Sequence, residues 1–244
     1  MLAIMSTIPS LSFNMKKEYI QNKIYEGFSL VEMLVTMIII GFVFLLVAST
    51  LTTLIRVSTI STAKTTVRSE SEFVLELIRR NVRNSNIGDV LVFNTSGRVY
   101  NGITVVEDGD VLGFDTPLDA GVQGNEIHFR PNGYSRWICI GYFVDSEDAN
   151  MGYILKSSSD DISSDHSVCF DPDLSDYQKY TIQLNSEDVD INTFGVKYIE
   201  STYDNYMIIA DINAEPVHWY EGSGKLFNKE VNRQVAVSTE GLTW

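Results

Sequence analysis

The feature that most constrains this chain is a long apolar run near its N-terminus. Between Glu32 and Arg56 the sequence has no charged side chain, and no proline interrupts residues 28–86. At a rise of about 1.5 Å per residue, roughly 20 apolar residues cross the hydrocarbon core of a bilayer. Because every backbone N–H and C=O in lipid must be satisfied within the segment, we predict that residues 33–55 form one membrane-crossing helix.

One carboxylate lies at the start of this run. An acidic side chain within hydrocarbon costs about 2.5–3.5 kcal/mol on insertion scales. Glu32 therefore either has a specific partner or lies solvated at the headgroup boundary.

The string Gly27-Phe28-Ser29-Leu30-Val31-Glu32-Met33 resembles the processing and N-methylation site of type IV prepilins and pseudopilins. The resemblance implies that a prepilin peptidase cuts after Gly27 and that the new N-terminus, Phe28, is methylated. It also implies an assembly role for Glu32, whose carboxylate would pair with the Phe28 amine of a neighbouring subunit. That amine is cationic or close to it at neutral pH, and a low dielectric strengthens such a pair.

Residues 1–27 are predicted to be a cytoplasmic leader peptide. Lys16, Lys17 and Lys23 precede the apolar run, and basic residues keep that side of a membrane helix in the cytoplasm. The C-terminus is therefore expected outside. We expect Met15 to be the true initiator, with residues 1–14 lying upstream of it.

Beyond the transmembrane or filament-core segment, residues 28–55, the helical period continues. Residues 56–87 form its amphipathic continuation, with apolar positions at spacings of three, four and seven. This predicted stripe comprises Ile60, Ala63, Val67, Val74, Leu77, Ile78 and Val82. Gly88 fits a C-terminal cap, so one helix of about 55 residues is expected.

The apolar run departs from many type IV pilins, which carry a proline in its second half. Here Ser49 and Thr50 stand at about that place, and Gly41 is the only helix-weakening residue. In this respect the chain is more similar to pseudopilins and minor pilins. Whether the helix melts locally in a filament stays an open question.

Residues 88–244 are predicted to form an acidic, extracytoplasmic, β-rich globular domain. Short β-prone runs alternate with turn signals such as Asn132-Gly133, which favours antiparallel pairing. The predicted strands are 89–93, 103–106, 111–114, 126–129, 137–144, 153–156, 180–184, 194–200, 206–214 and 233–238. The expected fold is α+β and pilin-like: a long N-terminal helix packed on a mostly antiparallel sheet.

Charge is unevenly distributed along the chain. Residues 1–27 carry a net charge of +1, residues 28–87 carry +2, and the remainder carries −17. An acidic domain repels phosphate backbones, so nucleic-acid binding is not expected.

Cys139 and Cys169 are the only cysteines, and both lie in the predicted outward domain. An even pair in an oxidising compartment predicts a disulfide. Two buried free thiols are the alternative, and a catalytic thiol is less favoured because no base lies nearby in the sequence.

Sequence motifs for catalysis or metal binding are weak or absent. The three histidines are far apart, and none of the common hydrolase or nucleotide-binding patterns occurs. Asp171, Asp173 and Ser175 begin like a calcium loop, but the turn glycine and the closing glutamate are missing. We therefore expect no enzyme activity, cofactor or metal, and interpret this segment as a solvated acidic loop.

The mature chain is interpreted as a minor type IV pilin or pseudopilin, a structural subunit of an envelope filament that aids filament initiation or function. The resemblance implies as partners the prepilin peptidase and methylase, other pilins or pseudopilins, and the membrane assembly platform with its ATPase. It also implies a single-pass membrane protein that later enters an extracellular filament. Two alternatives stay open: a filament-borne adhesin or uptake receptor, and an uncleaved membrane-anchored protein.

Overall fold

A computed structural model of the chain describes residues 27–94, 99–100, 105–106, 116–148, 150–158, 170, 181–200, 206–219 and 228–239. The chain divides into two compact units, Met1–Leu51 and Thr52–Trp244.

The predicted helix is confirmed. Helix α1 (Leu30–Arg83) is a continuous α-helix of 54 residues, unbroken at Gly41, Ser49 and Thr50. It is the one helix in the described part of the chain that is long and apolar enough to cross a membrane. The large apolar side chains of α1 that belong to the first unit, between Leu30 and Leu51, are exposed.

The predicted end of the helix is wrong by a few residues. The chain leaves α1 after Arg83, and Gly88, predicted as the cap, lies inside the first strand. In the last turn the N–H of Asn84 is shared between two carbonyls, and the Oγ of Ser85 donates to the carbonyl of Asn81. Strand pairing then takes over, because the N–H of Asn132 donates to the carbonyl of Asn84 at 2.6 Å.

Ten strands in the described part of the second unit form two sheets. Sheet A has the path β1-β4-β5-β2-β3, with β6 pairing with β5 and β7 with β6. Sheet B has the order β10-β9-β8. The strands of sheet A are β1 (Ser85–Phe93), β2 (Val99–Tyr100), β3 (Val105–Val106), β4 (Glu126–Pro131), β5 (Ile138–Asp145), β6 (Gly152–Ser158) and β7 (Ile182–Gln183). Those of sheet B are β8 (Val189–Glu200), β9 (Tyr206–Pro216) and β10 (Val231–Ser238).

The α+β fold with mostly antiparallel sheets is confirmed. The exception is β2, which was not predicted and pairs in parallel with β5. Strand β8 begins five residues before the predicted start, across a polar stretch that contains a register shift between Ile191 and Thr193. The turn at Asn132-Gly133 is confirmed, with Gly133 in the left-handed region at φ 82°. The strand predicted at 111–114 lies outside the described residues.

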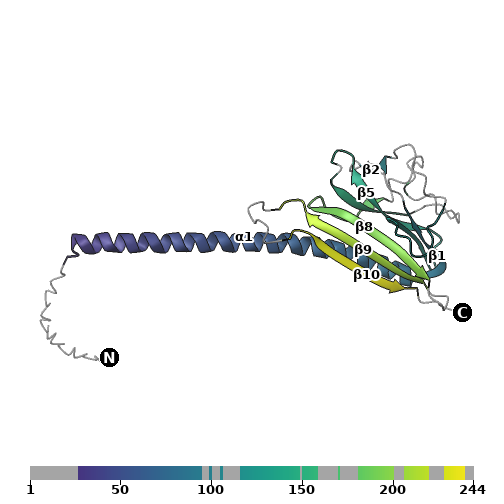
Figure 1. Ribbon diagram of the computed structural model, residues 1–244, viewed down its shortest axis with the longest axis horizontal. Helices are drawn as coiled ribbons and strands as arrows, with labels where there is room; N and C mark the ends of the chain where they lie inside the picture. Colours follow the sequence, from purple (N-terminus) through teal and green to yellow (C-terminus); the bar gives the residue numbers. More distant parts are fainter. Residues whose placement is uncertain are drawn as a thin grey trace, which may run out of the picture. The chain divides into compact units, whose positions relative to one another are not determined.

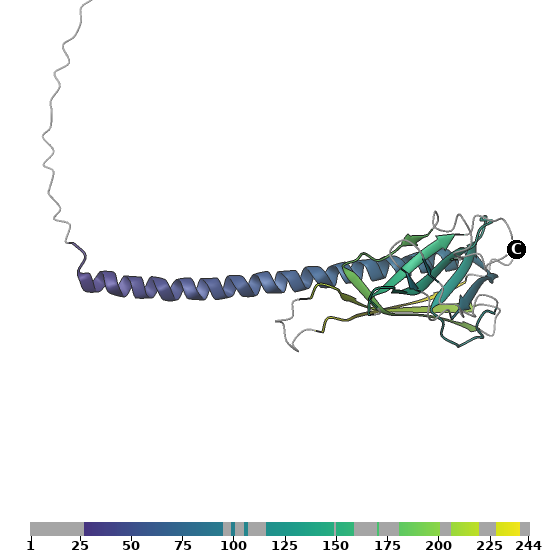
Figure 2. The same ribbon diagram turned by 90° about the horizontal axis from the view of Figure 1, so that it is seen from above.

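The main core lies between the second half of α1 and both sheets (Figures 1 and 2). The buried face of α1 consists of Ile60, Val67, Ser71, Val74, Leu75, Ile78 and Val82. This buried face contains most of the predicted stripe. It also contains Ser71 and Leu75, which the predicted stripe lacks. Ser71 is tolerated there because its hydroxyl donates to the carbonyl of Val67 at 2.8 Å.

A polar contact ties the helix to sheet B at the surface. Both carboxylate oxygens of Glu70 are used: Oε2 accepts from the N–H of Ser186 at 2.9 Å and Oε1 from its hydroxyl at 2.7 Å. Ser186 lies just before β8. The helix therefore holds sheet B through this bidentate contact as well as through apolar packing.

Candidate processing and assembly site

The segment expected to be cut lies immediately before the helix. Gly27, Phe28 and Ser29 are non-helical, and α1 begins at Leu30. Phe28 is 75% exposed. A Cβ built on Gly27 would meet no atom within 4 Å, so nothing in the described chain itself demands glycine there. Any requirement for a small residue must come from whatever binds this segment.

Ser29 and Glu32 form a capping box at the start of α1. The N–H of Glu32 donates to Ser29 Oγ at 3.2 Å, and the N–H of Ser29 donates to Glu32 Oε2 at 3.0 Å. The first helical bond runs from the N–H of Met33 to the carbonyl of Ser29 at 3.1 Å. This reciprocal arrangement satisfies two backbone donors that a helix N-terminus otherwise leaves unpaired.

The capping box shows how an acid can stand at the start of an apolar helix. The carboxylate of Glu32 is hydrogen-bonded within its own chain and lies near the positive end of the helix dipole. Among the described residues, none donates a hydrogen bond to its second oxygen, Oε1. One oxygen thus stabilises the helix start, and the other can accept a donor from another molecule.

Ser29 is the residue that the sequence reasoning missed. The spacing Ser29-Leu30-Val31-Glu32, directly before an apolar run, is the sequence signature of a capping box. The signal is therefore present in the sequence, but the two expectations for Glu32, a specific partner or solvation at the headgroup boundary, did not include a contact with Ser29.

Other predicted sites lie partly outside the described residues. Cys139 is fully buried on β5 and is in the disulfide-bonded form. Its predicted partner, Cys169, lies outside the described residues, so the Cys139–Cys169 pairing stays a prediction. The weak calcium loop of Asp171, Asp173 and Ser175 also lies outside them. Within the described ranges no group of acidic, histidine and cysteine residues is arranged to hold a metal.

A buried acid–histidine pair on β4 was not predicted. Glu126 and His128 lie two residues apart on one face of the strand, both side chains are fully buried, and His128 Nε2 contacts Glu126 Oε1. The ring of Phe93 lies 4.4 Å from the imidazole. Because neither group reaches the surface, we interpret this pair as part of the core.

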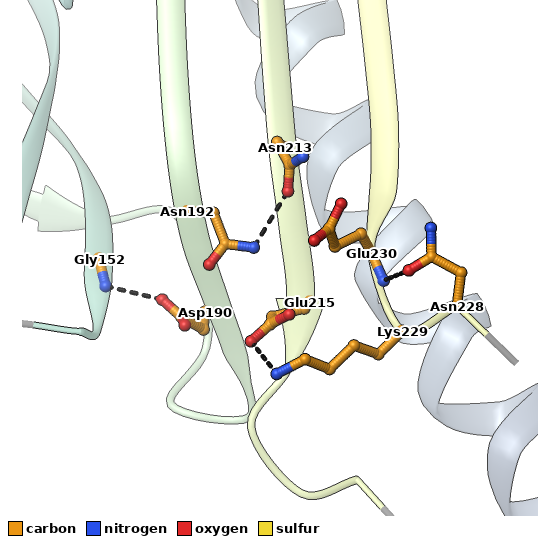
Figure 3. A network of polar contacts seen from close by, with 8 residues as sticks. All are labelled: Gly152, Asp190, Asn192, Asn213, Glu215, Asn228, Lys229 and Glu230. Atoms are coloured by element: carbon orange, nitrogen blue, oxygen red, sulfur yellow. Dashed lines mark hydrogen bonds and ion pairs between the residues drawn. The ribbon is translucent and has the colours of Figure 1, made fainter. Parts of the chain in front are cut away.

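Figure 3 shows a polar network where sheet A meets sheet B. The N–H of Gly152 on β6 donates to Asp190 Oδ1 on β8 at 2.9 Å. A Cβ on Gly152 would lie 2.1 Å from the carbonyl oxygen of Ile191, so only glycine allows this approach. Burial raises the pKa of Asp190; the Gly152 hydrogen bond opposes that rise. Lys229 and Glu215 form an ion pair nearby, at 2.5 Å.

Comparison with known proteins identifies the N-terminal segment. Residues 23–48 match the prokaryotic N-terminal methylation motif. The match contains Gly27, Phe28 and the capping box, and covers 26 of the 244 residues. No curated protein matches the chain significantly, and no solved structure does so.

Proposed function

We propose, from the premise that this chain is a type IV pilin-like member of the prepilin family, that its mature form is a minor pilin or pseudopilin. Prepilin peptidase cuts after Gly27 and the freed Phe28 is methylated. The mature subunit then enters an envelope filament together with other pilins, through the assembly platform and its ATPase. The observation that carries this proposal is the methylation motif placed directly on an exposed apolar helix whose first turn contains Glu32.

The exposed helix gives the subunit a reason to assemble. Residues 33–55 contain no charged side chain, and the large apolar side chains among them are exposed. Such a surface needs lipid before assembly and other apolar helices after it. We propose that α1 first anchors the chain in the membrane as a single span, with the C-terminus outside, and then enters the filament core.

Glu32 sets the axial register of the subunit as it moves from the membrane into the filament. Its Oε2 stays with Ser29, and its Oε1 accepts the Phe28 amine of a neighbouring subunit. An ion pair in an apolar surrounding is much stronger than one in water, because few solvent dipoles screen it. Removing one partner leaves an uncompensated buried charge, which costs about 3–5 kcal/mol.

The test replaces Glu32 with alanine and, separately, with glutamine. We expect both variants to insert and to be cleaved, and both to be nearly absent from sheared filaments, as measured by immunoblot against the unmodified subunit. Glu32→Gln keeps an oxygen for the Ser29 N–H but carries no charge, so it separates helix capping from ion pairing. Normal incorporation of Glu32→Gln would refute the ion pair.

Cleavage separates the filament subunit from an uncleaved anchor. The mature chain begins at Phe28 in our proposal, and gel migration of the precursor against the mature form measures this directly. Protein that retains residues 1–27 in cells with an active peptidase would favour the membrane-anchored alternative. The position of labelled subunits, at filament tips or along the shaft, tests the adhesin alternative.

A further inference from the structure

The two edges of sheet B differ in how the chain covers them. At the β8 edge, Gly124 and Val196 exchange backbone hydrogen bonds of 2.7 and 2.9 Å, and the N–H of Gly121 donates to the carbonyl of Tyr198 at 2.8 Å. At the opposite edge β10 pairs with β9, and no other strand in the described ranges pairs with it. An open strand edge presents N–H and C=O groups that can pair with another strand.

Apart from Arg233, a charged residue on its inner face, strand β10 lacks the usual protection of an edge strand. It is eight residues long, contains no proline, and pairs with β9 in continuous register. Arg233 is its only charged residue; its Nη2 lies 3.3 Å from Glu72 Oε1 on the helix. The more exposed side chains, which alternate along its outer face, are uncharged: Asn232, Gln234, Ala236 and Ser238. Bulges, prolines and outward charges normally discourage strand addition, and none is found here.

A groove lies between this edge and α1. Its volume is about 620 Å³, and its walls include Phe73, Glu76 and Arg79 from the helix and Arg233, Gln234 and Val235 from β10. Phe73 is 56% exposed, an unusual position for a large aromatic side chain on the polar side of an amphipathic helix. Exposed aromatic residues beside a groove are typical anchors of protein interfaces.

We propose that the β10 edge binds an extended strand of a different filament subunit. The strand would extend sheet B by backbone hydrogen bonds and bury an apolar side chain against Phe73. Such strand addition obtains affinity from the backbone and specificity from alternate side chains. This inference rests on the proposed function, because it requires neighbouring subunits in a filament.

The geometry favours another protein over a second copy. Within the second unit, strand β10 runs in the same direction as residues 52–83 of α1 (Figure 1). Antiparallel pairing of two β10 strands about a two-fold axis would point the two α1 helices in opposite directions, which chains inserted alike in one membrane cannot do. The side chains of the mature subunit, residues 28–244, carry a net charge of −15, which also makes copies of this chain repel one another. The partner strand is therefore neutral or basic, with apolar residues at alternate positions.

Amide hydrogen exchange tests the strand addition directly. The mature full-length chain is compared in detergent micelles and in sheared filaments. In filaments we expect at least tenfold slower exchange for the β10 amides that point away from β9. The amides that pair β8 with Gly124 are the internal control and should stay unchanged. Unchanged β10 exchange in filaments that contain the subunit overturns this inference alone. Absence of the subunit from filaments overturns the proposed function, and this inference with it.

Two variants test the anchor and the other occupants. Phe73→Ala should lower incorporation about tenfold with an unchanged melting temperature, whereas Tyr134→Ala, at a side chain 65% exposed, should have no effect. Equal incorporation of the two variants would contradict the anchor.

Deleting residues 240–244 tests whether the C-terminal tail of this chain occupies the edge. If the deletion speeds β10 exchange in detergent, or if the chain is a dimer there, the inference is wrong.

Discussion

The two halves of α1 share one helical backbone and differ in what their apolar side chains contact. In the first unit, Ile39 is 56% exposed, and the neighbouring apolar residues are exposed as well. In the second unit, Ile78 is fully buried against the sheets. The domain itself buries one apolar face of the second half. The apolar side chains of the first half are exposed in the chain by itself, so in the proposed function lipid and then other subunits cover them.

A large loss of domain stability should come from truncating a buried position of the second half. Ile78→Ala removes core contacts and leaves a cavity, so it should lower the free energy of unfolding by about 3 kcal/mol. Ile39→Ala should leave the unfolding of the domain unchanged within about 0.5 kcal/mol. Denaturation of the full mature chain in detergent, followed by near-ultraviolet circular dichroism, measures both. Equal losses for the two variants would remove the distinction between the halves.

The domain is also expected to be held covalently. A Cys139–Cys169 bridge closes 31 residues, and its loss should cost about 3–4 kcal/mol in the chain-entropy model. The double variant Cys139→Ser, Cys169→Ser should therefore melt well below the unmodified chain. Alkylation of the denatured, unreduced protein should add no tags. Two tags would show free thiols and refute the pairing.

A smaller effect is expected where the first half begins. Ser29→Ala removes one side of the capping box and should destabilise the helix start by about 1 kcal/mol. Faster amide exchange at residues 30–33 in micelles would show this, with the melting temperature of the domain unchanged. Ser29→Thr keeps the hydroxyl and serves as the control. If Ser29→Ala exchanges like the control, the capping box contributes nothing to the membrane half.

The smallest effect concerns pH and belongs to the domain alone. Burial raises the Asp190 pKa above its ordinary value of 3.8, so the folded state binds this proton more tightly than the unfolded state. Its contribution is therefore fully present below pH 3.8 and is lost as pH rises through the folded pKa. Asp190→Asn keeps an oxygen for the Gly152 N–H, and its stability relative to the unmodified chain should increase over that rise.

Asp145 provides a control of opposite sign. Desolvation acts to raise its pKa, but hydrogen bonds from the N–H groups of Glu147 and Asp148 and from the Tyr153 hydroxyl outweigh it, and the pKa is lowered. Asp145 therefore contributes stability above its unfolded pKa, and this is lost as pH falls through the folded pKa. As pH rises toward 3.8, Asp145→Asn should lose stability relative to the unmodified chain, whereas Asp190→Asn gains stability as pH rises above 3.8. Parallel pH profiles for the two variants would contradict both assignments.

Much of this protein could be predicted from local sequence pattern. The uninterrupted apolar run and the spacing of Val67, Val74 and Ile78 are patterns between residues close together in the chain. They predicted the membrane-length helix and its buried stripe, and together with the short β-prone runs they predicted the fold class. Ser29 could have been found in the same way, since a capping box is a contact between residues three apart.

Only the tertiary structure decided the features that depend on distant residues. Helix α1 ends at Arg83, before Gly88, because Asn84 accepts a hydrogen bond from Asn132. The burial of the Glu126–His128 pair, and the position of β10 at one end of sheet B among the described strands, follow from how the sheets pack, which no local pattern specifies. Short-range periodicity determines where a helix forms and which face is apolar. Where a helix ends, and which strands pair along a sheet edge, depends on competing contacts between segments far apart in the chain.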